Sequence, residues 1–260
     1  MIIPYNKQFI DKQDIKFVTK ILNSKNLTQG KIGNRFEKDL KKKFKAMYCS
    51  VVSNGTAALY LSIKALNLKK NCKILTTPIT FVSTVSSIMM NDLTPTFADI
   101  DKETFTIDPN QVEDILKKDK KIKAIVGVDY AGNPCDWRAL NYLKKRYNLK
   151  LINDNCHAMG SKLNNDIGYA IKNSDIVTHS YHAIKNFTTG EGGSVLTNDK
   201  KIYELVNNYR SHNMIKTSKD SKKFGRWFYK VNTIGYNYRL TDIQSALGIT
   251  QLNKLNKFII

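Results

Sequence analysis

The sequence is poor in cysteine, proline and glycine, and it contains no long apolar run. Its four cysteines, Cys49, Cys72, Cys135 and Cys156, lie far apart and form no CxxC pair, so we expect reduced thiols rather than disulfides. With only 5 prolines, 13 glycines and 42% apolar residues, disordered and collagen-like classes are excluded. No stretch approaches the ~18 apolar residues of a membrane span, and the N-terminus lacks the apolar run of a signal peptide. We therefore expect a cytoplasmic protein with no membrane partner.

The net charge of +20 comes almost entirely from lysine, because only six of the 42 basic residues are arginine. The lysines are scattered, and asparagine and isoleucine are abundant too, which indicates a compositional bias. A nucleic-acid-binding protein more often uses arginine for bidentate phosphate contacts, interleaved with exposed aromatics. We expect no specific nucleic-acid partner, and only attraction of an anionic substrate such as a nucleotide.

Short β-rich runs alternate with helical patterns along the 260 residues, and this alternation predicts an α/β fold with a large buried core. Helices are expected at 11–22, 33–44, 56–65, 81–90, 110–117, 136–147 and 201–209, and from Thr241 onward. Strands are expected at 73–76, 96–98, 124–128, 149–153, 176–180 and 194–197.

A small-residue turn, Ser53-Asn54-Gly55-Thr56, opens directly into the third of these helices. The first amides of a helix lack internal partners and the helix dipole favours negative charge there, so this turn can seat a phosphate. Taken alone, the segment fits better with an ordinary helix cap by Ser53 or Asn54. The chain has no GxGxxG motif after a strand and no Walker A motif, which excludes dinucleotide and P-loop sites.

An apolar strand at 149–153 ends at Asp154, and His157 follows three residues later. Ligand sites of α/β sheets lie beyond the carboxyl ends of strands. Asp154 could therefore serve a catalytic pair or anchor a cofactor, or it could simply cap a loop. Two such groups are too few for a metal site, so we expect no metal.

Lys185 follows a strand that ends at Ser180 and precedes the glycine-rich turn Gly190–Gly193. One lysine among many is by default a solvated surface residue. Apolar neighbours change that expectation, because a buried lysine has a depressed pKa and becomes a nucleophile that forms Schiff bases. A phosphate seat, a carboxylate and a lysine are the three groups that pyridoxal 5'-phosphate (PLP) needs, with the carboxylate keeping the pyridine nitrogen protonated.

Eight ordered segments resemble the DegT/DnrJ/StrS family of PLP-dependent sugar aminotransferases. They are Leu27–Gly30, Ser53–Leu59, Pro78–Thr84, Asp129–Gly132, Asp154–His157, Ser180–Lys185 with Gly190–Gly193, Arg210–His212 and Gly235–Leu240. The resemblance covers the whole chain. It implies the large domain of the type I (aspartate aminotransferase-like) PLP-dependent transferase fold, with a mixed, mostly parallel sheet flanked by helices.

The resemblance also implies a role for individual positions. Lys185 matches the lysine that carries PLP and moves the proton between the substrate and cofactor carbons. Asp154 matches the carboxylate at the pyridine nitrogen, and His157 matches the contact to the phenolic oxygen. Phe81 matches the aromatic ring stacked on PLP, although a core phenylalanine is the alternative. His182 receives no role.

The remaining matches concern the phosphate of PLP. Gly55, Thr56 and Ser180 match its seat. Asn237 matches a residue that reaches the phosphate from a second subunit, which implies a homodimer with shared active sites. Asn213 departs from the family, which usually has glycine after the residue equivalent to His212.

Four stretches, 22–25, 128–132, 182–185 and 244–248, resemble the aminotransferases of pseudaminic acid synthesis. That resemblance implies transfer of an amino group from glutamate to the 4-keto carbon of a UDP-linked 4-keto-6-deoxy-N-acetyl hexose, for a surface or flagellar sugar. Another keto-sugar nucleotide is an alternative substrate. A PLP-dependent sugar dehydratase is a further alternative, but members with that activity have histidine in place of the lysine.

Family members continue beyond the last helix into a smaller C-terminal domain. We therefore expect residues 1–240 to form the PLP-binding large domain with an N-terminal helical segment. Residues 241–260 would begin the helix that leads to the small domain, which this chain lacks. A truncated, inactive PLP-binding fragment is the corresponding alternative to an active enzyme.

Overall fold

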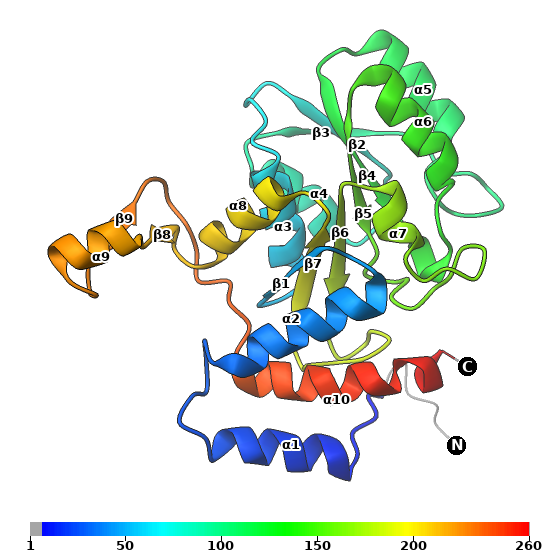
Figure 1. The fold of residues 1–260 in the computed structure, drawn as a ribbon. Helices are drawn as coiled ribbons and strands as arrows, with labels where there is room; N and C mark the ends of the chain where they lie inside the picture. Colours follow the sequence, from blue (N-terminus) through cyan, green and yellow to red (C-terminus); the bar gives the residue numbers. More distant parts are fainter. Residues whose placement is uncertain (1–6, 260) are drawn as a thin grey trace.

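Seven strands form one mixed sheet at the centre of the computed structural model, which describes residues 7–259 (Figure 1). They are β1 (Tyr48–Val52), β2 (Lys73–Thr76), β3 (Thr94–Phe97), β4 (Ile122–Val128), β5 (Lys150–Asp154), β6 (Ile176–Ser180) and β7 (Gly193–Thr197), in the spatial order β1-β7-β6-β5-β4-β2-β3. The pairs from β3 to β6 are parallel, whereas β7 runs antiparallel to both β6 and β1. The predicted α/β fold with a mixed, mostly parallel sheet is confirmed.

Helices cover both faces of this sheet (Figure 1). The helices of the described residues are α1 (Lys12–Leu22), α2 (Lys31–Phe44), α3 (Gly55–Ala65), α4 (Val82–Met89), α5 (Pro109–Lys118), α6 (Trp137–Tyr147), α7 (Tyr169–Asn173), α8 (Lys200–Arg210), α9 (Ser218–Phe224) and α10 (Asp242–Phe258). Of these, α1 packs on α10 and α9 lies away from the sheet (Figure 1). One apolar core gathers Phe36 of α2 and Trp137 of α6, and a second gathers Leu61 of α3 and Val206 of α8. The central strands are apolar on both sides because each face packs on helices.

Each helix and strand expected from the sequence is present, with ends within two residues of those predicted. Strand β1, the short helix α7 and the segment around α9 were not predicted. Strand β1 pairs with β7, for example Tyr48 with Thr197, so its partner lies far away in the sequence. Local patterns do not carry such long-range pairing.

An arm formed by β8 (Met214–Ile215), α9 and β9 (Lys230–Val231) extends away from the body (Figure 1). Large apolar side chains on and beside this arm are open to solvent, with Trp227 74% and Ile234 78% exposed. Such a surface on an extended arm is typical of contact with another chain.

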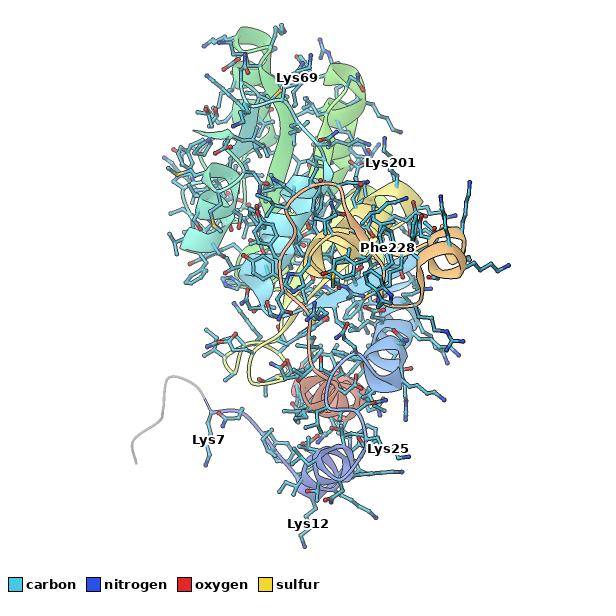
Figure 2. All side chains as sticks on the ribbon, turned by 90° about the vertical axis from the view of Figure 1, so that its left-hand side faces the viewer. Lys7, Lys12, Lys25, Lys69, Lys201 and Phe228 are labelled. Atoms are coloured by element: carbon cyan, nitrogen blue, oxygen red, sulfur yellow. The ribbon has the colours of Figure 1, made fainter. Side chains whose placement is uncertain are left out.

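The basic side chains are spread over the whole surface. Lys12, Lys69 and Lys201 are exposed and project from three distant parts of the molecule (Figure 2). This distribution agrees with the compositional interpretation of the net charge.

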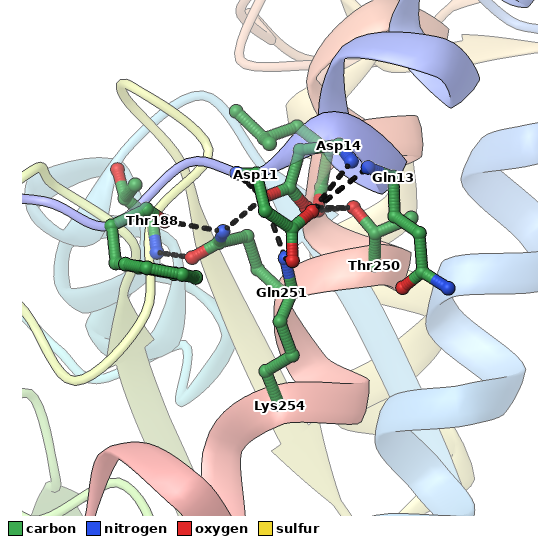
Figure 3. Close-up of polar contacts among 9 residues, drawn as sticks. Asp11, Gln13, Asp14, Thr188, Thr250, Gln251 and Lys254 are labelled. Carbon is green, nitrogen blue, oxygen red and sulfur yellow. Dashed lines mark hydrogen bonds and ion pairs between the residues drawn. The ribbon is translucent and has the colours of Figure 1, made fainter.

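Helix α10 ties α1 to the body through the buried carboxylate of Asp14 (Figure 3). This carboxylate accepts hydrogen bonds from Lys254 Nζ at 2.6 Å and Gln251 Nε2 at 2.8 Å. Gln251 Oε1 in turn accepts from the backbone N–H of Thr188 at 3.5 Å. Because Thr188 closes the loop that contains Lys185, α10 supports both the N-terminal helix and that loop.

Candidate functional site

Two of the residues predicted to hold a cofactor lie at the carboxyl ends of β5 and β6. Asp154 is the last residue of β5 and Ser180 the last of β6, and the two strands are parallel neighbours. Parallel strands bring their carboxyl ends to one edge of the sheet, which is where ligands of α/β proteins bind. The fold therefore places these two side chains on the same edge.

The start of α3 lies against the end of β6. A Cβ atom built on Gly55 would stand 2.8 Å from Ser180 Cβ, so only glycine permits this approach. Asn54 caps the helix, with its side-chain oxygen accepting from the Ala57 amide at 2.7 Å. The cap and the phosphate seat, which the sequence left as alternatives, are thus compatible, since one cap satisfies only one of the first-turn amides.

Asp154 is only 4% exposed, and its carboxylate is held from two sides. Thr84 Oγ1, from α4, donates to Oδ2 at 2.7 Å, and the Cys156 amide donates to Oδ1 at 3.3 Å. Thr84 was not predicted as a site residue, although it lies one helical turn after Phe81. The hydrogen bond leaves the carboxylate in a fixed orientation, which suits an anchor for a cationic ring nitrogen.

Lys185 lies on the loop after β6 and His157 on the loop after β5, so both follow the strand ends that form this edge. Burial, and after it the Lys185 charge, lowers the pKa of His157. Burial, followed by the Asp154 charge, raises the pKa of the Cys156 thiol, and Lys185 opposes that rise. These effects agree with the prediction that the lysine, the histidine and the carboxylate lie at the same edge of the sheet.

The loop that carries Lys185 is closed by its own hydrogen bonds. The Lys185 amide donates to His182 O at 2.9 Å, and His182 Nδ1 accepts from the Ile184 amide at 3.3 Å. His182 Nε2 also lies 3.7 Å from a carboxylate oxygen of Glu191. These contacts give His182 a structural part in shaping the loop.

Phe81 directly precedes α4 and is 64% exposed, so it is not a core phenylalanine. Its ring is free to cover a planar ligand. Asn237 is exposed and its backbone pairs with Ser211. Within the described residues, no hydrogen bond joins the Asn237 side chain to the other predicted site residues.

Arg239 adds an unpredicted positive group beside this site. Its backbone pairs with Val52 of β1, and the Ser53 amide donates to the carbonyl of neighbouring Tyr238 at 2.9 Å. The Arg239 Nε and Nη1 atoms are buried and have no hydrogen-bond partner among residues 7–259. Two buried guanidinium nitrogens without a partner are suited to an anion.

Two other classes of site receive no support. In the part of the chain that the structure describes, no three His, Cys, Asp or Glu side chains are grouped as metal ligands. Among the helices within residues 7–259, none combines the length and apolar character needed to cross a bilayer. The site is thus an amine, a held carboxylate and a helix start, which together can bind a phosphorylated aromatic aldehyde.

Comparisons with known proteins agree with this geometry. Residues 8–260 match the DegT/DnrJ/EryC1/StrS aminotransferase family model. The chain is 38% identical over 255 residues to the Helicobacter pylori UDP-4-amino-4,6-dideoxy-N-acetyl-beta-L-altrosamine transaminase, covering 96% of this chain and 64% of that protein. The solved structure of Helicobacter pylori PseC, an aminotransferase of pseudaminic acid biosynthesis, superposes with a TM-score of 0.90 at 35% identity, covering 98% of this chain and 66% of that one.

A GDP-4-keto-6-deoxy-D-mannose-3-dehydratase from E coli, solved with hydrated PLP, also superposes with a TM-score of 0.89 at 29% identity, covering 98% of this chain and 68% of that one. The chain spans slightly less than two thirds of the curated relatives that it matches. The family model, in contrast, matches nearly every residue of it. The chain therefore belongs to the DegT/DnrJ/EryC1/StrS aminotransferase family.

Proposed function

We propose that this chain binds PLP on Lys185 and belongs to an aminotransferase that acts on a nucleotide-linked keto sugar. The observation that carries the proposal is the placement of Asp154 at the end of β5 and of Lys185 on the loop after β6, because these strands are parallel neighbours. The relative that is a UDP-4-amino-4,6-dideoxy-N-acetyl-beta-L-altrosamine transaminase supports a UDP-linked 4-keto-6-deoxy-N-acetyl hexose as acceptor. Glutamate as the donor rests on the family resemblance alone.

The residues present fit PLP on structural grounds. Gly55 lets the start of α3 pack directly on Ser180, so the first-turn amides of α3 and the hydroxyls of Thr56 and Ser180 could reach one phosphate at this edge. Asp154 would hold the ring nitrogen and His157 the phenolic oxygen, with Phe81 over the ring. The unpartnered Arg239 donors are consistent with an anion at this edge.

When bound, PLP would draw electrons from the substrate carbon that carries the nitrogen. Asp154, oriented by Thr84, would keep the ring nitrogen protonated. Lys185 Nζ would take a proton from one carbon and return it to the other, first as a base and then as an acid. The lowered pKa keeps His157 neutral near pH 7, so its ring can share a hydrogen bond without adding charge.

A dehydratase is the second candidate, because a sugar dehydratase superposes closely on this chain. The family resemblance associates that activity with histidine at the position of Lys185. The lysine therefore favours amino transfer. Incubation with glutamate and a UDP-linked keto sugar distinguishes the two, since transfer leaves the nitrogen of glutamate on the sugar, whereas dehydration followed by hydrolysis releases that nitrogen as ammonia.

We also infer a cytoplasmic homodimer in which Asn237 reaches the cofactor phosphate of the other subunit. The exposed apolar arm and the lack of a contact from Asn237 to its own site within the described residues support this inference. Sedimentation gives the oligomeric state. Mixing Lys185→Ala with Asn237→Ala subunits tests the sharing, because a mixed dimer would contain one intact site.

A further inference from the structure

Asp129 is a fully buried carboxylate at the end of β4, next to Asp154 but outside the proposed cofactor contacts. Its oxygens accept five hydrogen bonds, from the Cys135 amide (2.9 Å) and Trp137 Nε1 (2.9 Å) on Oδ1, and from Asn153 Nδ2 (3.0 Å), Asn155 Nδ2 (2.9 Å) and Tyr169 OH (2.6 Å) on Oδ2. Burial raises the pKa of Asp129, and these donors oppose the rise. Because donors reach both oxygens of the carboxylate, each oxygen has to act as a hydrogen-bond acceptor.

Two of these donors come from the residues on either side of Asp154. Successive side chains of a strand point to opposite faces, so Asn153 and Asn155 point away from the face that Asp154 uses. Both amides reach the same atom, Asp129 Oδ2. The carbonyl oxygen of the Asn153 side chain is buried and has no partner among residues 7–259. Asp129 is thus the acceptor for the side-chain nitrogen of Asn153, while the side-chain oxygen of Asn153 stays without a donor.

The backbone and the remaining donors extend the same connection. The Asp129 amide donates to Asp154 O at 3.2 Å, which continues the pairing of Val128 with Asp154. Tyr169, from α7, also accepts from Asn155 Nδ2 at 2.9 Å. Asp154 is thus fixed by Thr84 on the side of its own carboxylate and by Asp129 through both chain neighbours.

We propose that Asp129 is a positioning residue that holds Asp154 in place for the ring nitrogen of the cofactor. The proposal rests on the proposed function, because it assumes that Asp154 is the anchor. Hydrogen bonds to ionised acceptors are short and strong, and five of them at one buried atom pair leave the end of β5 little freedom. Residues that hold a cofactor-contacting side chain from behind determine its orientation, and they also contribute to the stability of the fold.

The test compares four variants for PLP affinity, for the absorbance spectrum of bound PLP, and for the melting temperature without PLP. Asp129→Asn turns an amide group toward at least two of the donors, and Tyr169→Phe removes one donor alone. Asp154→Asn removes the anchor. Asp175→Asn is the matched control, because Asp175 accepts from the Leu151 amide at 2.8 Å near the opposite end of β5.

We expect Asp129→Asn to raise the Kd for PLP by about 10-fold and to shift the spectrum in the direction that Asp154→Asn shifts it. Tyr169→Phe should act in the same direction by about 3-fold. Asp175→Asn should lower the melting temperature and leave both cofactor readouts unchanged.

An unchanged Kd and spectrum in Asp129→Asn, with a clear effect in Asp154→Asn, would overturn the proposal while leaving the proposed function intact. If Asp129→Asn does not fold, Tyr169→Phe decides, and wild-type cofactor readouts in that variant overturn the proposal. If Asp154→Asn itself binds PLP like the wild type, the assigned anchor and thus the proposed function are wrong.

Discussion

Gly55 and Ser180 touch across the edge of the sheet, although 124 residues separate them in the chain. A methyl group on Gly55 would meet Ser180 Cβ at 2.8 Å, closer than Cβ atoms approach in real proteins. The contact brings the start of α3 onto the end of β6. The contact thereby brings together the Gly55–Thr56 turn and Ser180, which the family resemblance assigns to one phosphate site.

Gly55→Ala tests this contact. The added methyl group must displace Ser180 or the start of α3, which should weaken PLP binding by at least 10-fold and lower the free energy of unfolding by about 1–3 kcal/mol. Gly33→Ala is the control, because a Cβ there would lie 3.5 Å from its nearest neighbour, an ordinary contact. Isothermal titration with PLP and urea unfolding measure the two effects. Wild-type affinity in Gly55→Ala would argue against a phosphate at this position.

Thr84→Val tests the support of Asp154. Valine keeps the shape of threonine but cannot donate to Asp154 Oδ2, so an ionised carboxylate loses a 2.7 Å hydrogen bond. We expect the Kd for PLP to rise by about 10-fold, equivalent to about 1.4 kcal/mol. Thr84→Ser retains the hydroxyl and should bind PLP nearly as well as the wild type. Equal affinities of the valine and serine variants would contradict this role of the hydroxyl.

Asp14→Ala tests the junction between α1 and α10. The change removes the buried acceptor of Lys254 and Gln251, but Lys254 keeps Asp11 at 2.8 Å and Gln251 keeps the carbonyl of Phe9 at 2.9 Å. We therefore expect the free energy of unfolding to fall by about 1–3 kcal/mol. The exposed pair of Asp114 with Lys117 supplies the comparison, and Asp114→Ala should leave the free energy of unfolding nearly unchanged, because solvent screens an exposed ion pair. Denaturant titration measures both. Similar losses would show that burial at α10 does not strengthen the interaction.

The buried histidine His179 should make the free energy of unfolding depend on pH. Burial lowers the pKa of this histidine to about 3, whereas in the unfolded chain it takes up the proton near the ordinary histidine pKa of 6.5. Its contribution is present above pH 6.5 and is lost as pH falls, by up to about 1.4 kcal/mol per pH unit. His179→Gln should therefore flatten the loss of stability between pH 7 and pH 5, measured by urea unfolding without PLP. A wild-type slope in this variant would refute the assignment.

The alternation of strands and helices predicted the sheet and its flanking helices because those elements are apolar on a regular period. Lys185 and Asp154 could be found for a related reason, since each follows a strand that local sequence reveals. Strand β1 and the Asp129 cluster could not. Strand β1 depends on pairing with β7, and the donors to Asp129 come from five positions that only the folded chain brings together.

Thermal stability with added PLP separates a cofactor-binding protein from an inert fragment. A ligand that binds only the folded state stabilises it, by about 2.7 kcal/mol at a concentration 100 times its Kd. We expect the melting temperature to rise with PLP in the wild type and to rise much less in Asp154→Asn. A melting temperature that does not respond to PLP would support the fragment alternative. The boundary of the large domain near Thr241 stays a prediction.

Covalent trapping of PLP tests most directly whether Lys185 is the residue that carries the cofactor. The protein is incubated with PLP, reduced with borohydride, freed of excess cofactor and digested, and the modified peptide is identified by mass spectrometry. We predict one PLP group per chain, attached to Lys185, and its loss in Lys185→Ala. Attachment to a different lysine, or an equal yield of adduct in Lys185→Ala, would contradict the assignment of Lys185 and with it the proposed function.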